Sequence, residues 1–519
     1  MPSESPRPLS ETLSPKQKRA ITGGVMLAMF LAALDATVVS TAMPTVISKL
    51  GGFEVYSWVF SAYMLTSTVS VPLWGRLSDL YGRKRFYLLG IGLFMLGSVL
   101  AGQSHSMSML IATRTLQGLG AGALFPLSIT IVGEIYSLEQ RARMQGVFSG
   151  VWGFASIVGP LAGGFLTDTL SWRWVFYVNI PFGIAAAAVV ALAMHEPQRP
   201  RKKVTIDYLG AFSLTASMTL LLLGLLRGGQ SGWLDAGVLA MVVGSATLLV
   251  LFSWWERRAP EPLFPLSLFD NTIFTTTSLS GLFVGMAMFG SISFLPLFVQ
   301  AVIGTSATDA GSSLTPFMLG WVVSSAVGGR LLLRIGYRPT IFIGMGFLLL
   351  GFVLFTQFGA DTSRGFVLLA VALAGVGMGL IIVNLLLAVQ NAVPKSQLGI
   401  ATSTSVFTRS IGGTIGVAIF GTVMVLSMQQ ALAGLSLERF SPEQVEQLRA
   451  LALRPSALIT RSAGNVAPEV LDALRGALAH ALHNVFIVGL GFVLLASLSV
   501  LLIPKGRAQD HVYQEPSTG

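Results

Sequence analysis

The residue with the clearest capacity for chemistry is Asp35, which lies in the apolar stretch FLAALDATVVSTAMP at positions 30–44. An acid deep in a membrane-spanning helix is costly unless it faces water, has a partner or is protonated. Burial disfavours the ionised form, so such a carboxyl group can take up and release a proton in a working cycle. We therefore expect Asp35 to bind a proton or a cationic substrate. The alternative is a permanent structural partner for a nearby cation.

Arg114 is the candidate partner of Asp35. It lies about seven residues from the outer end of its apolar segment, and Asp35 lies about nine from the outer end of its own, depths of about 10 and 13 Å at 1.5 Å per residue. The two side chains would share a level if their helices are neighbours. Arg114 would then stabilise the ionised acid; otherwise it would bond backbone carbonyls.

Two further charges lie within apolar segments. Glu134 stands close to Arg141 and to a basic loop, so we expect an ion pair of a cytoplasmic gate there or, alternatively, a second proton carrier. Arg409, in VFTRSIGG, has few acids available to it. It either faces a cavity and balances Asp35 across the molecule, or it has a structural role within its own half.

A cluster of glycines and charges follows the second apolar segment. Glycines permit a tight turn and a close backbone approach, and an acid can cap the N-terminus of a facing helix or pair with a basic neighbour. We expect a clamp that closes the cytoplasmic side in one state; the alternative is a simple basic anchor. The residues are Gly75, Asp79, Gly82, Arg83, Lys84 and Arg85.

The fifth apolar segment contains several glycines and a proline, so its side chains are small at these positions. Such residues let helices meet closely, and a proline adds a kink. Plain packing and an interface for rocking between two states explain the pattern equally well. The residues are Gly150, Gly159, Pro160, Gly163 and Gly164.

The chemistry-bearing residues do not suggest a cofactor. The chain has no cysteine, and its five histidines fall in loops, tails or at segment edges, so no metal site is expected. The GxGxG patterns at 118–122 and 375–379 lie within apolar segments and indicate helix packing rather than nucleotide loops. We expect no cofactor, no metal and no enzymatic activity, with a proton gradient as the energy source.

Membrane helices must position all of these residues. Of 519 residues, 53% are hydrophobic and 11% charged, against about 25% charged in soluble proteins. Runs of roughly 18 or more apolar residues can cross a bilayer, and apolarity on all sides favours helices over a membrane barrel. We expect an all-α polytopic protein with fourteen spans, near 20–44, 56–78, 84–103, 107–136, 140–167, 172–194, 207–227, 233–255, 271–300, 309–333, 338–358, 364–393, 398–427 and 482–504.

Charge sets the expected orientation. The formal net charge is +10, and 22 of the 33 lysines and arginines fall on one side if the N-terminus is cytoplasmic. This is the positive-inside pattern. It predicts a multi-pass protein of the plasma (inner) membrane with both termini in the cytoplasm. Anionic membrane lipids, and not nucleic acid, are then the expected polyanionic partner.

Two pairs of segments nearly repeat. GRLSDLYGRKR at Gly75 and GRLLLRIGYRP at Gly329 are offset by 254 residues, and GPLAGG at Gly159 and GGTIGV at Gly412 by 253. Two matches at almost one offset predict homologous six-helix halves, a signature of secondary transporters. The expected parts are a cytoplasmic tail at 1–19, a first bundle at 20–200, an inserted two-helix hairpin at 201–256, a second bundle at 257–504 and a cytoplasmic tail at 505–519.

The one sizeable external loop is expected at 428–481. Within it, Ser441, Pro442 and Gln444 form a capping-box pattern with proline in the first turn. One or two amphipathic helices are therefore expected in the loop. A lid and a plain spacer are both open interpretations.

Several of these motifs resemble those of one family. GRLSDLYGRKR resembles the loop signature of the major facilitator superfamily, RTLQGLGAG (114–122) its fourth-span motif, and GVWGFASIVGPLAGG (150–164) the fifth-span motif of its exporters. LDATVVSTAMP (34–44) and SWRWVFYVNIPFG (171–183) resemble motifs of the fourteen-span drug:proton antiporter branch. The resemblance covers all fourteen spans.

The resemblance implies the major facilitator fold, with a central cavity open to one side at a time and export of amphipathic compounds against inward proton flow. It supports the pairing of Asp35 with Arg114, since spans one and four line the family's cavity. The chain departs from the family pattern in three places. Ser40 stands where the branch commonly has Asn, Leu333 replaces the acid of the second-half loop, and the loop before the last span is long. The second departure suggests only one full cytoplasmic latch.

The sequence thus predicts a monomeric multidrug efflux antiporter, relevant to antibiotic resistance, that exchanges protons for lipophilic or cationic drug-like compounds by alternating access. The alternative is an exporter of lipids or an endogenous metabolite with the same fold. Polar or aromatic residues in apolar spans are candidates for the substrate cavity, although helix packing explains each about as well. They are Tyr63, Gln117, Trp152, Gln300, Asn384 and Arg409.

Overall fold

The computed structural model describes residues 13–51, 58–195, 207–260, 262, 266–305, 312–359, 361–433, 441, 444 and 468–504. This part of the chain is almost entirely helical and contains no strand. The helices are α2 (Pro15–Leu50), α3 (Trp58–Tyr81), α4 (Arg83–Gly102), α5 (Met107–Ile135), α6 (Leu138–Thr169), α7 (Trp174–Tyr177), α8 (Asn179–Ala193), α9 (Tyr208–Ser231), α10 (Ala236–Glu256), α11 (Thr272–Leu297), α13 (Thr315–Ile335), α14 (Tyr337–Phe355), α15 (Arg364–Asn391), α16 (Leu398–Ala433) and α18 (Pro468–Leu501). Short helical turns lie at Leu266–Asp270, Phe298–Val302 and Lys395–Gln397.

Polar caps begin many of these helices. A serine, aspartate or asparagine side chain before the first turn accepts a backbone N–H that has no partner within the helix. Ser14 before α2 and Ser137 before α6 form full capping boxes with a glutamine three residues later. The other caps of this kind are Ser106, Asp207, Asp235, Asn271 and Ser363.

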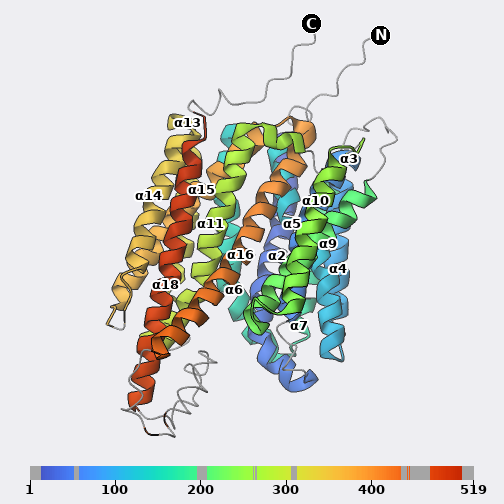
Figure 1. The fold of residues 1–519 in the computed structure, drawn as a ribbon. Helices are drawn as coiled ribbons and strands as arrows, with labels where there is room; N and C mark the ends of the chain where they lie inside the picture. Colours follow the sequence, from blue (N-terminus) through green and yellow to red (C-terminus); the bar gives the residue numbers. More distant parts are fainter. Residues whose placement is uncertain are drawn as a thin grey trace, which may run out of the picture.

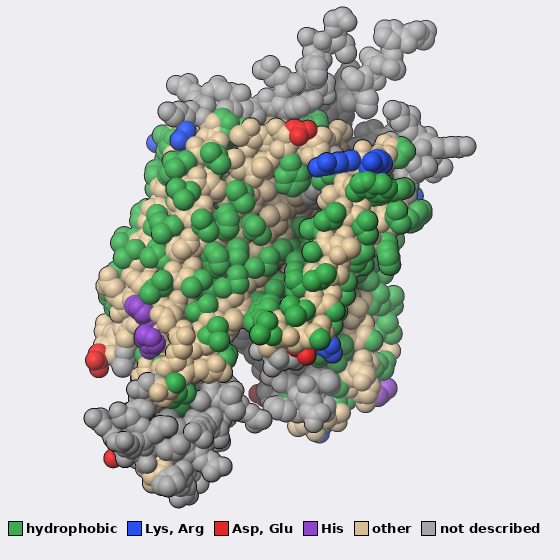
Figure 2. Space-filling view, viewed as in Figure 1, with side chains coloured by type: hydrophobic (Ala, Val, Ile, Leu, Met, Phe, Trp, Pro, Cys, Tyr) green, Lys and Arg blue, Asp and Glu red, His purple; other side chains and the backbone are tan. Residues whose placement is uncertain are grey.

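Among the described helices, thirteen stretches are long and apolar enough to cross a membrane, with α7 and α8 counted together as one. The 24-residue helix α3 has a similar length and carries more polar side chains. Hydrophobic side chains cover the flank of the molecule, and the charged side chains visible in the same view lie near its two ends (Figure 2). The expectation of an all-α polytopic membrane protein is confirmed.

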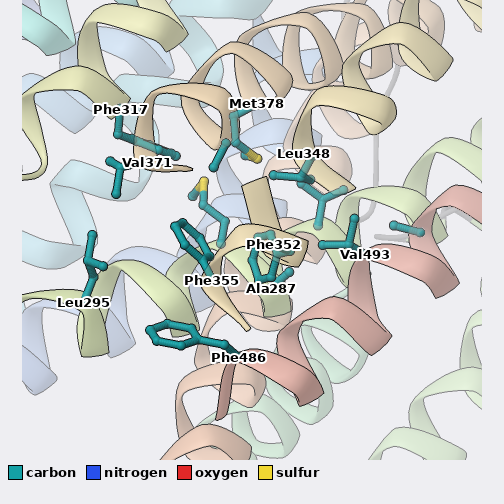
Figure 3. Close-up of a cluster of buried hydrophobic side chains, with 14 of the residues drawn as sticks. Ala287, Leu295, Phe317, Leu348, Phe352, Phe355, Val371, Met378, Phe486 and Val493 are labelled. Carbon is teal, nitrogen blue, oxygen red and sulfur yellow. The ribbon is translucent and has the colours of Figure 1, made fainter. Parts of the chain in front are cut away.

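Each half packs around its own interior. In the first half α5 contacts α2, α3 and α4, and α2 also packs against α6 and α8. In the second half α11, α14 and α15 enclose a core to which α18 contributes Phe486 and Val493 (Figure 3). The ring centroids of Phe355 and Phe486 are 5.4 Å apart. Lipid is as apolar as these side chains, so close packing rather than water exclusion holds the helices together.

Helices α9 and α10 form a hairpin between the two halves in the sequence. They pack chiefly against each other, and α9 also contacts α3 of the first half and α16 of the second (Figure 1). Leu214 and Met218 of α9 share one apolar cluster with Val69 of α3 and Phe407 of α16. The hairpin therefore covers the seam between these two helices.

The halves meet closely at one end of the bundle. Helix α2 begins and α18 ends there, at the top in Figure 1, and we call it the terminal end. A Cβ atom at Gly75 of α3 would lie 2.8 Å from the carbonyl oxygen of Gly399 in α16. A Cβ atom at Gly329 of α13 would lie 3.0 Å from Cβ of Ala142 in α6. Gly75 and Gly329, the two glycines related by the internal repeat, thus permit two equivalent helix crossings.

Helices α16 and α18 extend into the segment 428–481, where the external loop is expected. Helix α16 continues to Ala433, and α18 begins at Pro468, fourteen residues before the last predicted span at 482–504. Apolar windows detect only the part of a helix that lies in lipid, so they miss helical ends that extend beyond it. The capping box inside the loop is present: Ser441 N–H donates to Gln444 Oε1 (2.8 Å), and Gln444 N–H donates to Ser441 Oγ (3.3 Å).

The crossing at Gly75 leads to a first prediction. Gly75→Leu would hold α3 and α16 apart, so we expect the terminal end to open. The distance between spin labels at Glu139→Cys on α6 and Arg334→Cys on α13 reports this opening. Both positions are exposed, and the chain has no native cysteine that would also be labelled. The distance distribution should move to longer values.

Gly92→Leu in α4 is the matched control, because no atom lies within 4 Å of a Cβ placed there. It should leave the distribution unchanged. An unchanged distribution for Gly75→Leu would show that this crossing does not hold the terminal end closed.

Candidate functional site

A buried ion pair joins α2 to α5. Arg114 Nη1 donates to Asp35 Oδ2 at 2.6 Å, and the two residues are 1% and 0% exposed. The pairing expected from the depths of the two residues is therefore present. The remaining oxygen, Asp35 Oδ1, accepts hydrogen bonds from Gln117 Nε2 (2.9 Å) and Asn179 Nδ2 (3.1 Å). The fully buried carboxylate thus accepts three hydrogen bonds, one on Oδ2 and two on Oδ1.

The guanidinium of Arg114 is held on every side. Its Nη1 also donates to Gln117 Oε1 (2.7 Å), and its Nε donates to the carbonyl of Val59 (3.4 Å). The ring of Tyr63 lies against it, with 4.0 Å between Cζ and the ring centroid. A buried charge is tolerated only when it is paired and hydrogen-bonded, and these contacts satisfy that condition. Tyr63 and Gln117, two of the candidates for the substrate cavity, both belong to this polar cluster.

Glycines bring the neighbouring helices up to the cluster. A Cβ atom at Gly97 of α4 would lie 2.6 Å from the backbone of Gln117, so only glycine lets α4 approach α5 at this level. That approach carries the next residue, Ser98, into the cluster, where its Oγ accepts from Gln117 Nε2 (3.2 Å) and from Asn179 Nδ2 (2.9 Å).

Asn179 is the first residue of α8, in the second part of the sixth predicted span. Helix α7 ends at Tyr177 and α8 begins at Asn179, with Val178 between them. Pro181 lacks a backbone N–H and so is tolerated in the first turn of a helix but not in its interior, which accounts for a helix start at this position. Val178 itself has helical dihedral angles (φ −57°, ψ −26°), and the Asn179 amide lies beside the carboxylate.

A second charged cluster lies at the terminal end. Asp79 of α3 accepts the backbone N–H groups of Gly399 (3.0 Å) and Ile400 (2.7 Å), so it caps the first turn of α16 across the seam between the halves. Arg83 pairs with Asp79 and, at 2.9 Å, with Glu134. An acid at a helix N-terminus is favourable because it meets unpaired N–H groups and the positive end of the helix dipole.

The other members of the expected clamp take different places. Gly82 has φ of 103°, a left-handed conformation that favours glycine, and it forms the turn between α3 and α4. Arg85 is exposed and Lys84 is half-buried. Glu134 pairs with Arg83, which fits the gate alternative; the Arg141 guanidinium instead donates to the carbonyl of Tyr136 (3.0 Å).

The glycines of α6 differ in their surroundings. A Cβ atom at Gly159 would meet Cβ of Thr37 in α2 at 2.8 Å, whereas Cβ atoms at Gly150 and Gly164 would have no neighbour within 4 Å. Gly163 is buried, and α6 runs without interruption through Pro160. Two glycines that the sequence did not single out, Gly146 and Gly153, face Ala326 and Val322 of α13.

The remaining cavity candidates are scattered. Trp152 is 39% exposed and packs edge-on against Phe125, while Gln300 is half-buried in the π-helical turn after α11. Asn384 is fully buried, and its Nδ2 donates to the carbonyl of Leu380 in its own helix (2.5 Å). Arg409 is half-buried, and within the described part of the chain no hydrogen bond or ion pair joins it.

Sequence reasoning missed Ser98 and Asn179. Both are uncharged, and uncharged polar residues are too common in membrane helices to stand out. The one available signal was the sequence VNIPFG at 178–183, where a polar residue stands two positions before a proline. That pattern is typical of a helix start, here with a polar side chain inside an apolar span.

Two helical bundles related by an internal repeat are the architecture of many secondary transporters. The chain belongs to the Major Facilitator Superfamily, whose family model matches residues 25–417.

Relatives and a solved structure agree with this assignment. The chain is 35% identical to the multidrug transporter protein MdtP of Bacillus subtilis (strain 168), over 92% of each chain. It is 33% identical to multidrug resistance protein 3 of the same strain, over 94% of this chain and 95% of that protein. The structure of the human organic anion transporter MFSD10 (TETRAN) shares the fold, with a TM-score of 0.59 at 16% identity, over 94% of this chain and all of that one.

The buried ion pair leads to a prediction about stability. Arg114→Leu leaves the Asp35 carboxylate buried without its cation, which costs about 3–5 kcal/mol. Thermal unfolding in detergent should show this loss, and the double variant Asp35→Asn/Arg114→Leu should recover part of it because no charge is then stranded.

Arg85→Leu is the control, because this arginine is exposed. Its effect should stay within about 0.5 kcal/mol. A double variant no more stable than Arg114→Leu would mean that the carboxylate is not the group left uncompensated.

Proposed function

We propose that this protein is a proton-coupled antiporter that exports lipophilic or cationic drug-like compounds by alternating access. The observation that carries the proposal is the Asp35 carboxylate, fully buried and held by Arg114, Gln117 and Asn179. It is the one acid that the described contacts place in this cluster. The printed names of the relatives, multidrug transporter and multidrug resistance protein, support the substrate class.

The chemistry of the pair supports the coupling. When Asp35 is ionised, its charge and that of Arg114 compensate each other; when Asp35 is protonated, the guanidinium loses its counter-charge. Protonation therefore changes the stability of the arrangement that joins α2 to α5. A proton that crosses the membrane down the potential contributes about 2.3 kcal/mol per 100 mV, which is enough to drive a useful concentration gradient.

The seam at the terminal end supports alternating access. Asp79 caps α16 of the opposite half, and Arg83 ties Asp79 to Glu134 of α5. We infer that the terminal end is cytoplasmic, in line with the positive-inside pattern, so the structure is closed toward the cytoplasm. Opening that end removes the cap from α16. This charged cluster is then a gate whose opening must be compensated by other contacts.

The same proposal covers location and partners. We place the protein in the plasma (inner) membrane as a monomer with both termini in the cytoplasm. Its partners are protons, small amphipathic or cationic substrates and membrane lipids, without a cofactor or nucleic acid. Transport of this kind would confer antibiotic resistance when an antibiotic is among the substrates.

Dye efflux from liposomes tests the proposal. The purified protein is reconstituted with a lipophilic cationic dye inside, and a pH gradient is imposed. Wild type should move the dye in response to the gradient, whereas Asp35→Asn should fall to the rate of protein-free liposomes because it cannot release a proton.

Asp361→Asn, which neutralises an exposed acid, is the matched control and should behave as wild type. Equal gradient-driven efflux by wild type and Asp35→Asn would overturn Asp35 as the proton site. Failure of wild type to move any cationic dye would overturn the drug substrate class and favour a lipid or an endogenous metabolite.

A further inference from the structure

One oxygen in the network around Asp35 has no partner. Asn179 is fully buried, and its Nδ2 donates both to Asp35 Oδ1 (3.1 Å) and to Ser98 Oγ (2.9 Å). Its Oδ1 accepts no hydrogen bond from any residue that the structure describes. A buried polar atom left without a partner is destabilising. Because nothing donates to this oxygen, no hydrogen bond to it opposes a change in the direction that the Asn179 amide faces.

A proton that arrives at Asp35 must sit on Oδ1. The other oxygen, Oδ2, accepts from Arg114 Nη1 at 2.6 Å, and a guanidinium cannot accept a hydrogen bond. Oδ1 faces two amide nitrogens, those of Gln117 (2.9 Å) and Asn179 (3.1 Å). Both nitrogens are donors, so in the present arrangement the new O–H group would have nothing to receive its hydrogen.

Only one of the two amides is free to turn. Gln117 Oε1 accepts from Arg114 Nη1 at 2.7 Å, so reversing the Gln117 amide would point an N–H group at the guanidinium. No such contact holds the oxygen of Asn179. Half a turn of its amide puts Oδ1 where Nδ2 now stands, within hydrogen-bond reach of both Asp35 and Ser98.

We propose that Asn179 is a positioning residue that reverses its side-chain amide when Asp35 takes up a proton. The proposal rests on the proposed role of Asp35 as the proton site. In the reversed state, Asn179 Oδ1 accepts the O–H of Asp35. The proton stays on Asp35, and no other covalent bond forms or breaks.

Ser98 then carries the change to the next helix. Its hydroxyl now donates to the carbonyl of Phe176 at 2.9 Å. Once Asn179 Oδ1 faces Ser98 Oγ, two acceptors meet unless that hydroxyl turns toward Asn179. This rotation of the Ser98 hydroxyl releases the Phe176 carbonyl in α7, the four-residue helix that lies just before Asn179. Protonation of Asp35 thereby loosens residues 174–179.

Few other groups bear on this switch. Among the residues that the structure describes, the charged or titratable side chains in contact with the cluster are Arg114 from α5 and Tyr63 from α3, whose ring lies against the guanidinium. Helix α4 contributes Ser98, α7 the Phe176 carbonyl and α8 Asn179. The response is therefore assigned to Asp35 and to no second acid.

Hydrogen–deuterium exchange of residues 174–179 tests the inference at a fixed pH. Asp35→Asn mimics the protonated acid, because its oxygen must face Arg114 and its N–H₂ group must then face Asn179. We expect exchange in this segment to be roughly three- to tenfold faster than in wild type, the range for loss of one net hydrogen bond. In the Asn179→Leu background, Asp35→Asn should produce no further change.

Ser98→Ala is the second variant and guards against misfolding of Asn179→Leu. Because it removes the hydroxyl that holds Phe176, exchange should be fast whether residue 35 is aspartate or asparagine. Equal exchange in wild type and Asp35→Asn would overturn the switch. If that result accompanies loss of gradient-driven dye efflux in Asp35→Asn, the proton site stands and only the role of Asn179 fails.

Discussion

The burial of one carboxylate is the constraint on which much of the first half depends. Asp35 is surrounded by helices, and an ionised acid there requires a cation and donors on both oxygens. Arg114 and Gln117 come from α5, Asn179 from α8, and Ser98 of α4 braces both amides. Four helices, α2, α4, α5 and α8, are therefore held around one buried charge.

The seam at the terminal end shows how the internal repeat became unequal. Gly75 and Gly329 make equivalent crossings, yet only the first has an acid four residues later, Asp79; the second repeat has Leu333 there. The ionic cap on α16 thus has no counterpart at the equivalent position of the crossing of α6 and α13. The fold keeps its approximate two-fold arrangement, while Asp79, the acid that caps a helix of the opposite half, lies at only one of the two crossings.

Charges in apolar spans made the sequence informative. Asp35 and Arg114 stood out because each is rare at such depth and each needs the other, so their contact could be predicted from helix geometry. The contact of Asn179 could not be predicted in this way, because an uncharged residue at the start of α8 carries no comparable signal. The C-terminal end of α16 and the N-terminal end of α18 were also missed, because hydropathy detects the part of a helix that lies in lipid and not the whole helix.

The hairpin of α9 and α10 makes the two flanks of the protein different. A compound dissolved in the bilayer therefore meets a different surface on each flank. On one flank, α9 shields the junction of α3 and α16. On the other, Val147 of α6 and Val323 and Val327 of α13 are exposed. Among the described residues, a lipophilic compound that diffuses in the lipid meets α6 and α13 directly on this second flank, whereas α9 covers the junction on the first. The inserted hairpin thus makes the transporter asymmetric within the plane of the membrane.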